Sequence, residues 1–397
     1  MNSTALRNGR IFAVMLLLAA PLAMCSAAGA RIDMHLVPGL GRVCHEAPRG
    51  ESATAVDGSL FAVCRDASGR PVVARVTLDG AVRRIALAGL DARARRWFRA
   101  RDLTWASDGA LWFHDGGGEV VRISSGLDAK AFRLSSVART SGLIAGRGGA
   151  LWLTASSATG AQAPRAIVHL SATGAERRIA ISRGSGAILP EAIADADGRG
   201  AWFREGVGRV GHVTVDGRHT TSAVSRDGRP VAVESDGTIA WLTFAPGQEV
   251  VRLGADGAEV SHTAVVPHAV SRPLPPGPGR GLDWSLCLLA ASELCQLDLG
   301  QATLNTFDMA QPGAYLNADP LRGPGGALWT RDSKGHLLRV RADGQTLSYP
   351  LHPRHGNTIN LLAASGAVLW MLEVNQHNRP HELTRVTTLP MRQLRRR

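Results

Sequence analysis

Four acidic residues occupy the same place in a recurring pattern, the third position after an aromatic residue. They are Asp115, Glu205, Asp332 and Glu373, which follow Trp112, Trp202, Trp329 and Trp370. Carboxylates at one level of a ring would face a common space near the mouth of its channel. There they could hold Mg²⁺ or Ca²⁺ through oxygen ligands, or raise one carboxyl pKa for acid-base work. The alternative interpretation is local: each carboxylate caps a turn or pairs with an arginine such as Arg204 or Arg331.

Histidine can supply the base or the metal ligand that such a site needs. His114 directly precedes Asp115, and His212 follows Glu205 closely in the chain. Glu205 and His212 are therefore the candidate catalytic pair, and the other candidate binding residues at the channel mouth are His114, Asp115, Asp332 and Glu373. The identity of a metal stays open. The sequence contains no Gly-x-Ser-x-Gly elbow, P-loop or dinucleotide fingerprint, so nothing supports the reaction classes that use them.

The aromatic residues in front of these carboxylates belong to a repeat. Its core is a turn rich in glycine followed by a short apolar strand with an aromatic residue, as in residues 108–113. The copies recur at intervals of roughly 40 to 50 residues, a period that is typical of repeat architectures. Eight aromatic residues anchor them: Phe61, Trp112, Trp152, Trp202, Trp241, Trp284, Trp329 and Trp370.

Each copy predicts four short strands. A polar-aliphatic pair such as Arg122-Ile123 follows the aromatic strand, a glycine turn follows that pair, and shorter apolar runs lie before and after. Four strands per copy with no helical periodicity indicate an all-β chain, a β-propeller with eight four-stranded blades. If the Phe61 copy belongs to a closing blade, the number of blades falls to seven. We expect residues 32–37 to supply the strand that the last copy lacks, so that the N- and C-terminal strands pair and close the ring.

The first 30 residues predict a secretory signal peptide. Residues 1–10 carry two arginines and no acid, residues 11–20 are wholly apolar, and small residues precede a cleavage site after Ala30. A membrane anchor is disfavoured, since a spanning helix needs about 20 apolar residues. We therefore expect a periplasmic or secreted protein without a transmembrane segment after cleavage, with residues 31–397 forming a single propeller domain. Cys25 leaves a lipoprotein as the minor alternative.

The charge of the chain limits the partners it can take. The formal net charge is +12, which suits acidic ligands or anionic components of the cell envelope. The densest basic-aromatic run, residues 93–101, is interpreted as an insertion between blades, and we expect no nucleic-acid partner for an exported chain. The expected partner is a small molecule, a peptide or an envelope protein, and the expected oligomeric state is a monomer.

Four cysteines remain after processing: Cys44, Cys64, Cys287 and Cys295. Export makes disulfides chemically possible. A turn between Cys287 and Cys295 could place them opposite each other in a hairpin, and Cys44 with Cys64 would tie the N-terminal segment to the first repeat. The alternative is two pairs of buried free thiols.

At residues 202–213, which read Trp-Phe-Arg-Glu-Gly-Val-Gly-Arg-Val-Gly-His-Val, the chain resembles virginiamycin B lyase and the wider family of streptogramin-lyase-like propellers. Residues 108–123 and 326–340 follow the same outline, so the resemblance extends over most of the chain. It implies a propeller fold and Mg²⁺-assisted opening of a cyclic depsipeptide by elimination, with a His base and a Glu-x-His pair. No Glu-x-His pair occurs in this sequence.

The sequence therefore favours an exported β-propeller that acts as a binding or scaffold module in the cell envelope. The alternative is a metal-dependent enzyme that opens a cyclic peptide or lactone, with Glu205, His212 and Asp115 as its candidate residues. The sequence does not identify a cofactor in either case, and the candidate carboxylates would suit Mg²⁺ or Ca²⁺.

Overall fold

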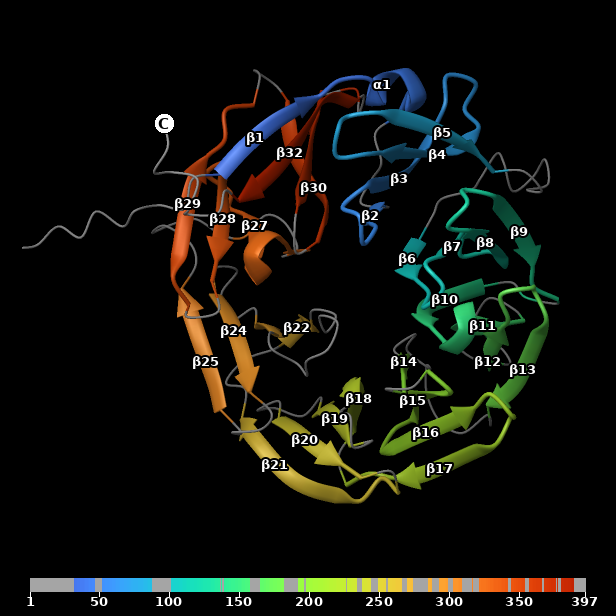
Figure 1. The fold of residues 1–397 in the computed structure, drawn as a ribbon. Helices are drawn as coiled ribbons and strands as arrows, with labels where there is room; N and C mark the ends of the chain where they lie inside the picture. The colour runs from blue at the N-terminus through green and yellow to red at the C-terminus, as the bar shows by residue number, and fades with distance from the viewer. Residues whose placement is uncertain are drawn as a thin grey trace, which may run out of the picture.

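The chain forms four-stranded antiparallel sheets arranged in a ring (Figure 1). The computed structural model describes residues 32–388 apart from gaps at 47–51, 88–100, 136, 138, 158–164, 182–191, 196–197, 226, 234–237, 244–248, 255, 266–269, 274–284, 288–292, 299–302, 309–315, 317–320, 342–343, 354–356, 366–367, 376 and 378–379. The predicted signal peptide lies outside these residues. No helix within them is long and apolar enough to cross a membrane.

Eight such sheets can be described, here called blades 1 to 8, and each is given from its inner to its outer strand. Blade 1 contains β2 (Ser52–Thr54), β3 (Leu60–Arg65), β4 (Pro71–Val76) and β5 (Val82–Ala86). Blade 2 contains β6 (Arg101–Trp105), β7 (Leu111–His114), β8 (Glu119–Ile123) and β9 (Ala129–Arg133). Blade 3 contains β10 (Arg139–Ala145), β11 (Leu151–Ser156), β12 (Arg165–Leu170) and β13 (Glu176–Ile181). Blade 4 contains β14 (Ala192–Ala194), β15 (Gly200–Gly206), β16 (Arg209–Thr214) and β17 (His219–Ala223).

The second half of the ring repeats this order. Blade 5 contains β18 (Gly228–Val233), β19 (Ile239–Thr243), β20 (Glu249–Leu253) and β21 (Glu259–Val265). Blade 6 contains β22 (Val270–Pro273), β23 (Ser285–Cys287), β24 (Glu293–Asp298) and β25 (Thr303–Asp308). Blade 7 contains β26 (Leu321–Arg322), β27 (Leu328–Arg331), β28 (His336–Val340) and β29 (Thr346–Pro350). Blade 8 contains β30 (Thr358–Ala364), β31 (Leu369–Val374), β32 (Pro380–Thr388) and β1 (Ile32–Val37). The short helices are α1 (Leu40–Val43), η1 (Arg147–Gly149) and η2 (Pro324–Gly326).

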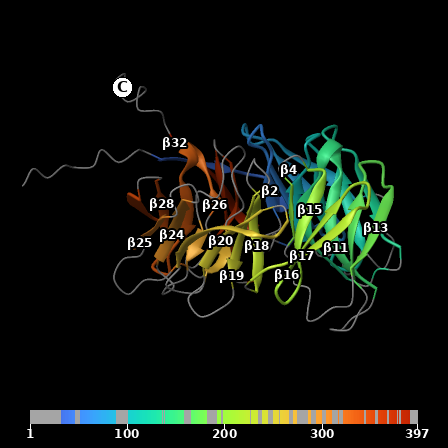
Figure 2. The same ribbon diagram turned by 90° about the horizontal axis from the view of Figure 1, so that it is seen from below.

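The hydrophobic core lies between neighbouring blades, because the second strand of a blade is buried on both faces. Alternate residues of a strand point to opposite sides. In β3, Leu60 and Ala62 pack in a cluster with residues of blade 8, whereas Phe61 and Val63 pack with residues of blade 2. Seen edge-on, the ring is flattened, and the blades stand side by side around it (Figure 2). Each sheet therefore needs both of its neighbours.

Several of the described anchor tryptophans tie their blade to the next one. Trp112 is fully buried, and its indole N–H donates a hydrogen bond to the carbonyl of Gly149 at 3.2 Å. Trp370 of blade 8 donates in the same way to Gly58 of blade 1 at 3.0 Å. Both carbonyls belong to the turn between the first two strands of the following blade. The aromatic repeat is therefore a packing device, as predicted.

The N-terminal strand closes the ring, which confirms the sequence prediction. β1 pairs antiparallel with β32, with Ile32 opposite Thr388 and Val37 opposite Leu383. Phe61 lies in a different sheet from this closing strand. The closing blade therefore combines the two ends of the described chain.

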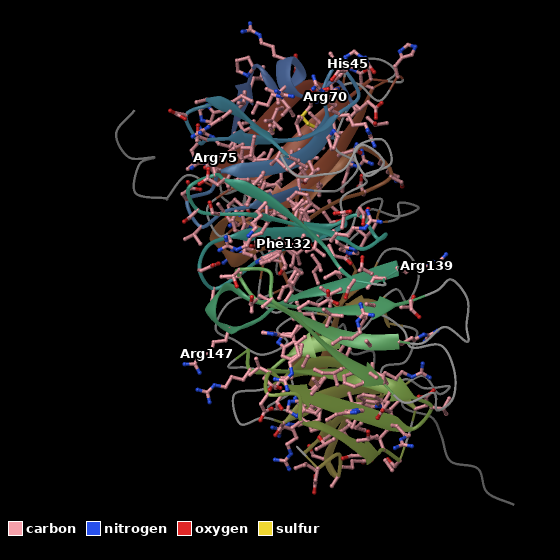
Figure 3. The ribbon with its side chains drawn as sticks, turned by 90° about the vertical axis from the view of Figure 1, so that its right-hand side faces the viewer. His45, Arg70, Arg75, Phe132, Arg139 and Arg147 are labelled. Atoms are coloured by element: carbon pink, nitrogen blue, oxygen red, sulfur yellow. A yellow bond between two sulfur atoms is a disulfide. The ribbon has the colours of Figure 1, made fainter. Side chains whose placement is uncertain are left out.

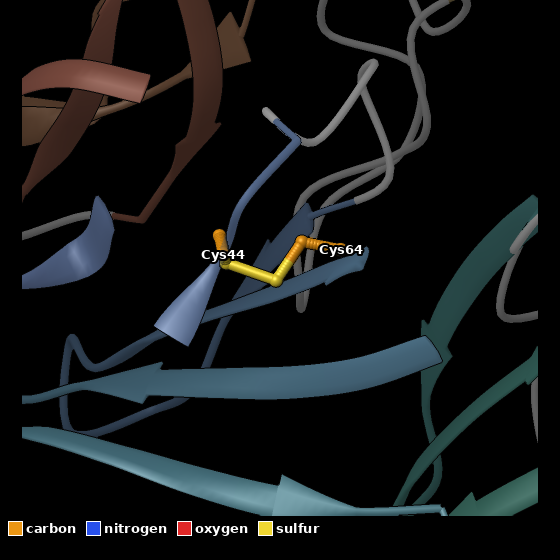
Figure 4. The surroundings of a disulfide bond; sticks show 2 residues. All are labelled: Cys44 and Cys64. Atoms are coloured by element: carbon orange, nitrogen blue, oxygen red, sulfur yellow. A yellow bond between two sulfur atoms is a disulfide. The ribbon is translucent and has the colours of Figure 1, made fainter. Parts of the chain in front are cut away.

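A disulfide joins Cys44 to Cys64 (Figure 4). Cys44 follows α1, and Cys64 lies on β3 of blade 1. The bond therefore fastens the segment after the closing strand to the first blade, as predicted. The side chains of Cys287 and Cys295 lie outside the described residues, so a second disulfide stays a prediction. In the backbone register, Cys295 lies opposite Ser285.

Candidate functional site

Two of the four predicted carboxylates cap the turn between the second and third strands of their own blade. Asp115 accepts hydrogen bonds from the backbone N–H groups of Gly117 at 2.6 Å and Glu119 at 3.0 Å. Asp332 does the same for Lys334 and His336 at 3.0 and 2.8 Å, and its other oxygen lies 3.0 Å from Nδ1 of His336. These contacts agree with the local interpretation of the two residues. We call the face of the ring that carries these turns the mouth face.

Glu205 is directed toward the outer strand of its blade. It lies in a register shift between β15 and β16, and it is 4% exposed. Its carboxylate accepts a hydrogen bond from the hydroxyl of Thr221 and lies 3.3 Å from Nε2 of His219, both on β17. The neighbouring Arg204 forms two hydrogen bonds with Asp227, at 3.0 and 2.6 Å. Burial raises the pKa of Asp227, but the Arg204 contacts and the Gly208 N–H outweigh this, so its pKa is lowered.

Glu373 also has a partner within its own blade, since it accepts a hydrogen bond from the Asn357 side chain at 2.7 Å. Each of the four carboxylates is thus engaged locally, and Asp332, at 1% exposure, is as buried as Glu205. The described residues contain no group of three or more His, Cys, Asp or Glu side chains arranged to hold a metal ion. A common acidic ring therefore has no support in the described part of the chain, and ligand contact by these residues stays a prediction.

His212 belongs to a repeated structural motif and does not meet Glu205. Its ring stacks on Trp202 with centroids 4.1 Å apart, and its Nε2 lies 3.0 Å from a carboxylate oxygen of Asp195. In blade 2 Arg122 contacts Trp112 and Asp108 in a similar way, and in blade 1 Arg75 contacts Phe61 and Asp57. In each blade the carboxylate comes from the turn between the first two strands, although not from the same turn position. In blade 3, His169 lies against Trp152, and burial, with a contribution from Arg177, lowers its pKa. The histidines of this position replace a structural arginine.

His114 is the predicted site residue that the structure places in a network between two blades. It is fully buried at the end of β7. Nδ1 accepts a hydrogen bond from the backbone N–H of Gly116 at 3.0 Å and lies 2.7 Å from the hydroxyl of Thr140 on β10. Because Nδ1 is an acceptor, the neutral ring carries its proton on Nε2. Nε2 donates this proton to Oδ2 of Asp102 on β6, with 3.0 Å between Nε2 and Oδ2. Asp102, His114 and Thr140 form what we call the mouth cluster.

Asp102 holds the exposed end of the mouth cluster. Its φ of 48° places it in the left-handed region, which is uncommon for a residue other than glycine. It lies in a register shift of the inner strand β6, between Arg101 and Thr104, and its side chain is 45% exposed. Oδ2 also accepts the backbone N–H of Gly142, at 3.1 Å, from a second irregular segment in β10. Unusual backbone conformations and β-bulges concentrate at functional sites.

Sequence reasoning missed Asp102 and Thr140. Each lies on an inner strand that has no anchor aromatic residue, and they meet His114 only because blades 2 and 3 pack side by side. The one local signal is Gly142, since a glycine inside a strand often marks a bulge.

The similarity of this chain to known proteins is a similarity of fold. No family model matches the sequence, and no curated protein matches it. Among solved structures, the chain is similar to a catalytically inactive virginiamycin B lyase from Staphylococcus aureus with quinupristin, at 15% identity over 90% of this chain and 100% of that one, with a TM-score of 0.48. It is also similar to apo AztD from Citrobacter koseri, at 14% identity over 83% and 94% of the two chains, with a TM-score of 0.50. Dihydro-heme d1 dehydrogenase NirN in complex with DHE gives 15% identity, 89% and 78% coverage, and a TM-score of 0.52. The resemblance to virginiamycin B lyase and other propellers is therefore confirmed as a resemblance of fold.

Proposed function

We propose that this β-propeller is an exported binding or scaffold module of the cell envelope, which takes a peptide, a protein or a small molecule on its mouth face. The observation that carries the proposal is Asp102 in the mouth cluster. The side chain of Asp102 is partly exposed at the inner edge of the ring, and its backbone has an uncommon conformation. Its carboxylate is held in place by His114 and by the backbone N–H of Gly142. A fixed carboxylate of this kind can accept hydrogen bonds from the donor groups of a ligand.

Two further observations support this proposal. The Cys44–Cys64 disulfide is typical of an oxidising compartment such as the periplasm or the extracellular space, in line with the predicted signal peptide. Glu205 and His212, which the lyase alternative needs together, are bound to different partners. The side chains that resemble catalytic groups therefore contribute to the blades themselves.

The binding proposal can be tested with a random-peptide phage library selected on the wild-type protein. We expect enriched peptides whose affinity, measured by isothermal titration calorimetry, falls by about ten- to a hundredfold in Asp102→Asn, because a hydrogen bond to a charged group is lost. Asp216→Asn is the matched control, since Asp216 is exposed on the turn between β16 and β17 on the opposite face. Equal affinity in Asp102→Asn and the wild type would contradict a mouth-face site.

The lyase alternative predicts a different result. Purified protein incubated with a streptogramin B antibiotic and Mg²⁺ would open the ring of the depsipeptide, as read by mass spectrometry, and a chelator would stop the reaction. Turnover that is lost in both Glu205→Gln and His212→Ala would replace the binding proposal by an enzymatic one.

A further inference from the structure

The outer strands of the propeller carry a strongly uneven distribution of charge. In blades 1, 2 and 3 every outer strand contains two basic residues, and in blades 4 to 8 no outer strand contains lysine or arginine. The six basic residues, which we call the basic rim, are Arg83, Arg84, Lys130, Arg133, Arg177 and Arg178, and all are exposed. The outer strands β1, β21 and β25 instead contain Asp33, Glu259 and Asp308. One side of the ring is therefore much more basic than the other.

Three members of the basic rim occupy equivalent positions in successive blades. Arg83 lies opposite Arg75, Lys130 opposite Arg122, and Arg177 opposite His169. The same position further round the ring holds Thr220, Ser261, Asn305, Leu347 and His35. The basic side chains thus form a row at one level across three neighbouring blades. Figure 3 looks onto this side of the ring, with Arg75 and Phe132 labelled on blades 1 and 2.

Local contacts neutralise the basic rim only in part. Arg84 pairs with Asp66, Arg133 with Glu119 and Arg178 with Glu176. Arg177 donates to backbone carbonyls of blade 4 and also interacts with the carboxylate of Asp216, whose pKa it helps to lower. Exposed ion pairs in water are weak, so a second anion can still interact with their guanidinium groups. Six cations against these four carboxylates still leave an excess of positive charge on the basic rim.

The shape of the basic rim indicates what it fits. The side chains lie on the convex outer edge of three blades and are spread over separate strands, so they do not enclose one small anion. Laterally mobile lipid headgroups can rearrange to meet such an array, whereas a rigid acidic protein would have to match its curvature. Clustered basic residues are attracted to anionic lipid surfaces within a Debye length, about 8 Å at physiological ionic strength.

We propose that the basic rim of blades 1 to 3 docks this protein on an anionic phospholipid surface. The inference goes beyond the proposed function, because the basic rim and the mouth face are separate surfaces. When the outer edge of the ring meets the membrane, the mouth face does not contact the membrane and stays open to a ligand.

The test is co-flotation of the purified protein with vesicles of phosphatidylcholine alone and of equimolar phosphatidylcholine and phosphatidylglycerol, at low and at high salt. We expect binding only to the vesicles with phosphatidylglycerol, weakened by salt. The double variant Arg83→Gln/Lys130→Gln is expected to bind about thirtyfold more weakly, at on the order of fivefold for each basic side chain near the surface. Arg83→Lys keeps the charge and should bind like the wild type.

The matched control is Arg209→Gln/Arg218→Gln, which removes the same charge from exposed positions on blade 4. It should keep nearly all of the binding and melt at the same temperature as the wild type. The proposal is overturned if the wild type binds both vesicle types equally or neither of them. An equal loss in the rim variant and the blade 4 control would also overturn it, because net charge and not the rim would then be responsible.

Discussion

At the scale of single residues, the anchor aromatics contribute most to stability. Trp112 combines complete burial, a hydrogen bond to the next blade and stacking on Phe132, with ring centroids 5.6 Å apart. Trp112→Ala should therefore lower the free energy of unfolding by about 3 to 5 kcal/mol. Urea unfolding followed by circular dichroism measures the change, with Trp112→Phe as the control that keeps most of the packing. Unfolding of the alanine variant at the wild-type urea concentration would contradict the packing role.

Asp66 links stability to pH. Burial raises the pKa of this carboxyl, but hydrogen bonds from Ser68, from the backbone of Arg70 and from Arg84 lower it more strongly, to about 2, against 3.8 in the unfolded chain. Because the folded-state pKa is the lower one, the stabilisation is fully present above about pH 4 and is lost as the pH falls toward 2. The wild type should exceed Asp66→Asn in stability at neutral pH and lose that advantage between pH 4 and 2. Urea midpoints across this range measure it, and a constant difference would refute the assignment.

At the scale of elements, the closing strand has the largest expected effect. β1 covers the edge of β32, and Val37 is buried in the cluster shared by blades 1 and 8. A chain that begins at residue 39 lacks β1 and should melt at a lower temperature and aggregate, because an uncovered edge strand can pair with another chain. A chain that begins at residue 31 keeps β1 and is the control. Calorimetry with light scattering compares them, and identical melting would show that β1 does not close the ring.

Elements were predictable where the determining residues are close in sequence. Glycines in the Asp57-Gly58 and Asp108-Gly109 turns adopt φ of 80° and 76°, a conformation that glycine permits and that these dipeptides predict. The anchor aromatics then fixed which strand is buried on both faces. The register shift at Glu205 was not predictable, because it depends on how β15 pairs with β16. That shift is associated with the partner that Glu205 finds, His219 in place of His212.

At the scale of the whole molecule, the fold was more predictable than the site. The repeat occurs in every blade, so the fold could be predicted even though the first copy has Phe in place of Trp. The mouth cluster, in contrast, is not part of the repeat. Its residues Asp102, His114 and Thr140 come from three strands of two blades. Such contacts depend on how neighbouring blades pack, and the spacing of residues in the sequence does not predict that packing. The disulfide between Cys44 and Cys64 was predictable because one cysteine lies in the N-terminal segment and the other in the first repeat, which the bond joins.

The pairing of β1 with β32 also sets an order of events during biosynthesis. Chains are made from the N-terminus, so β1 leaves the ribosome early and its partner appears only when most of the propeller has been made. Blades 1 to 7 can form their own sheets in sequence, but blade 8 cannot be completed before the last strand is available. Pairing of such distant segments is slow. We expect the period in which β1 is unpaired to be the stage of folding most exposed to misfolding and proteolysis.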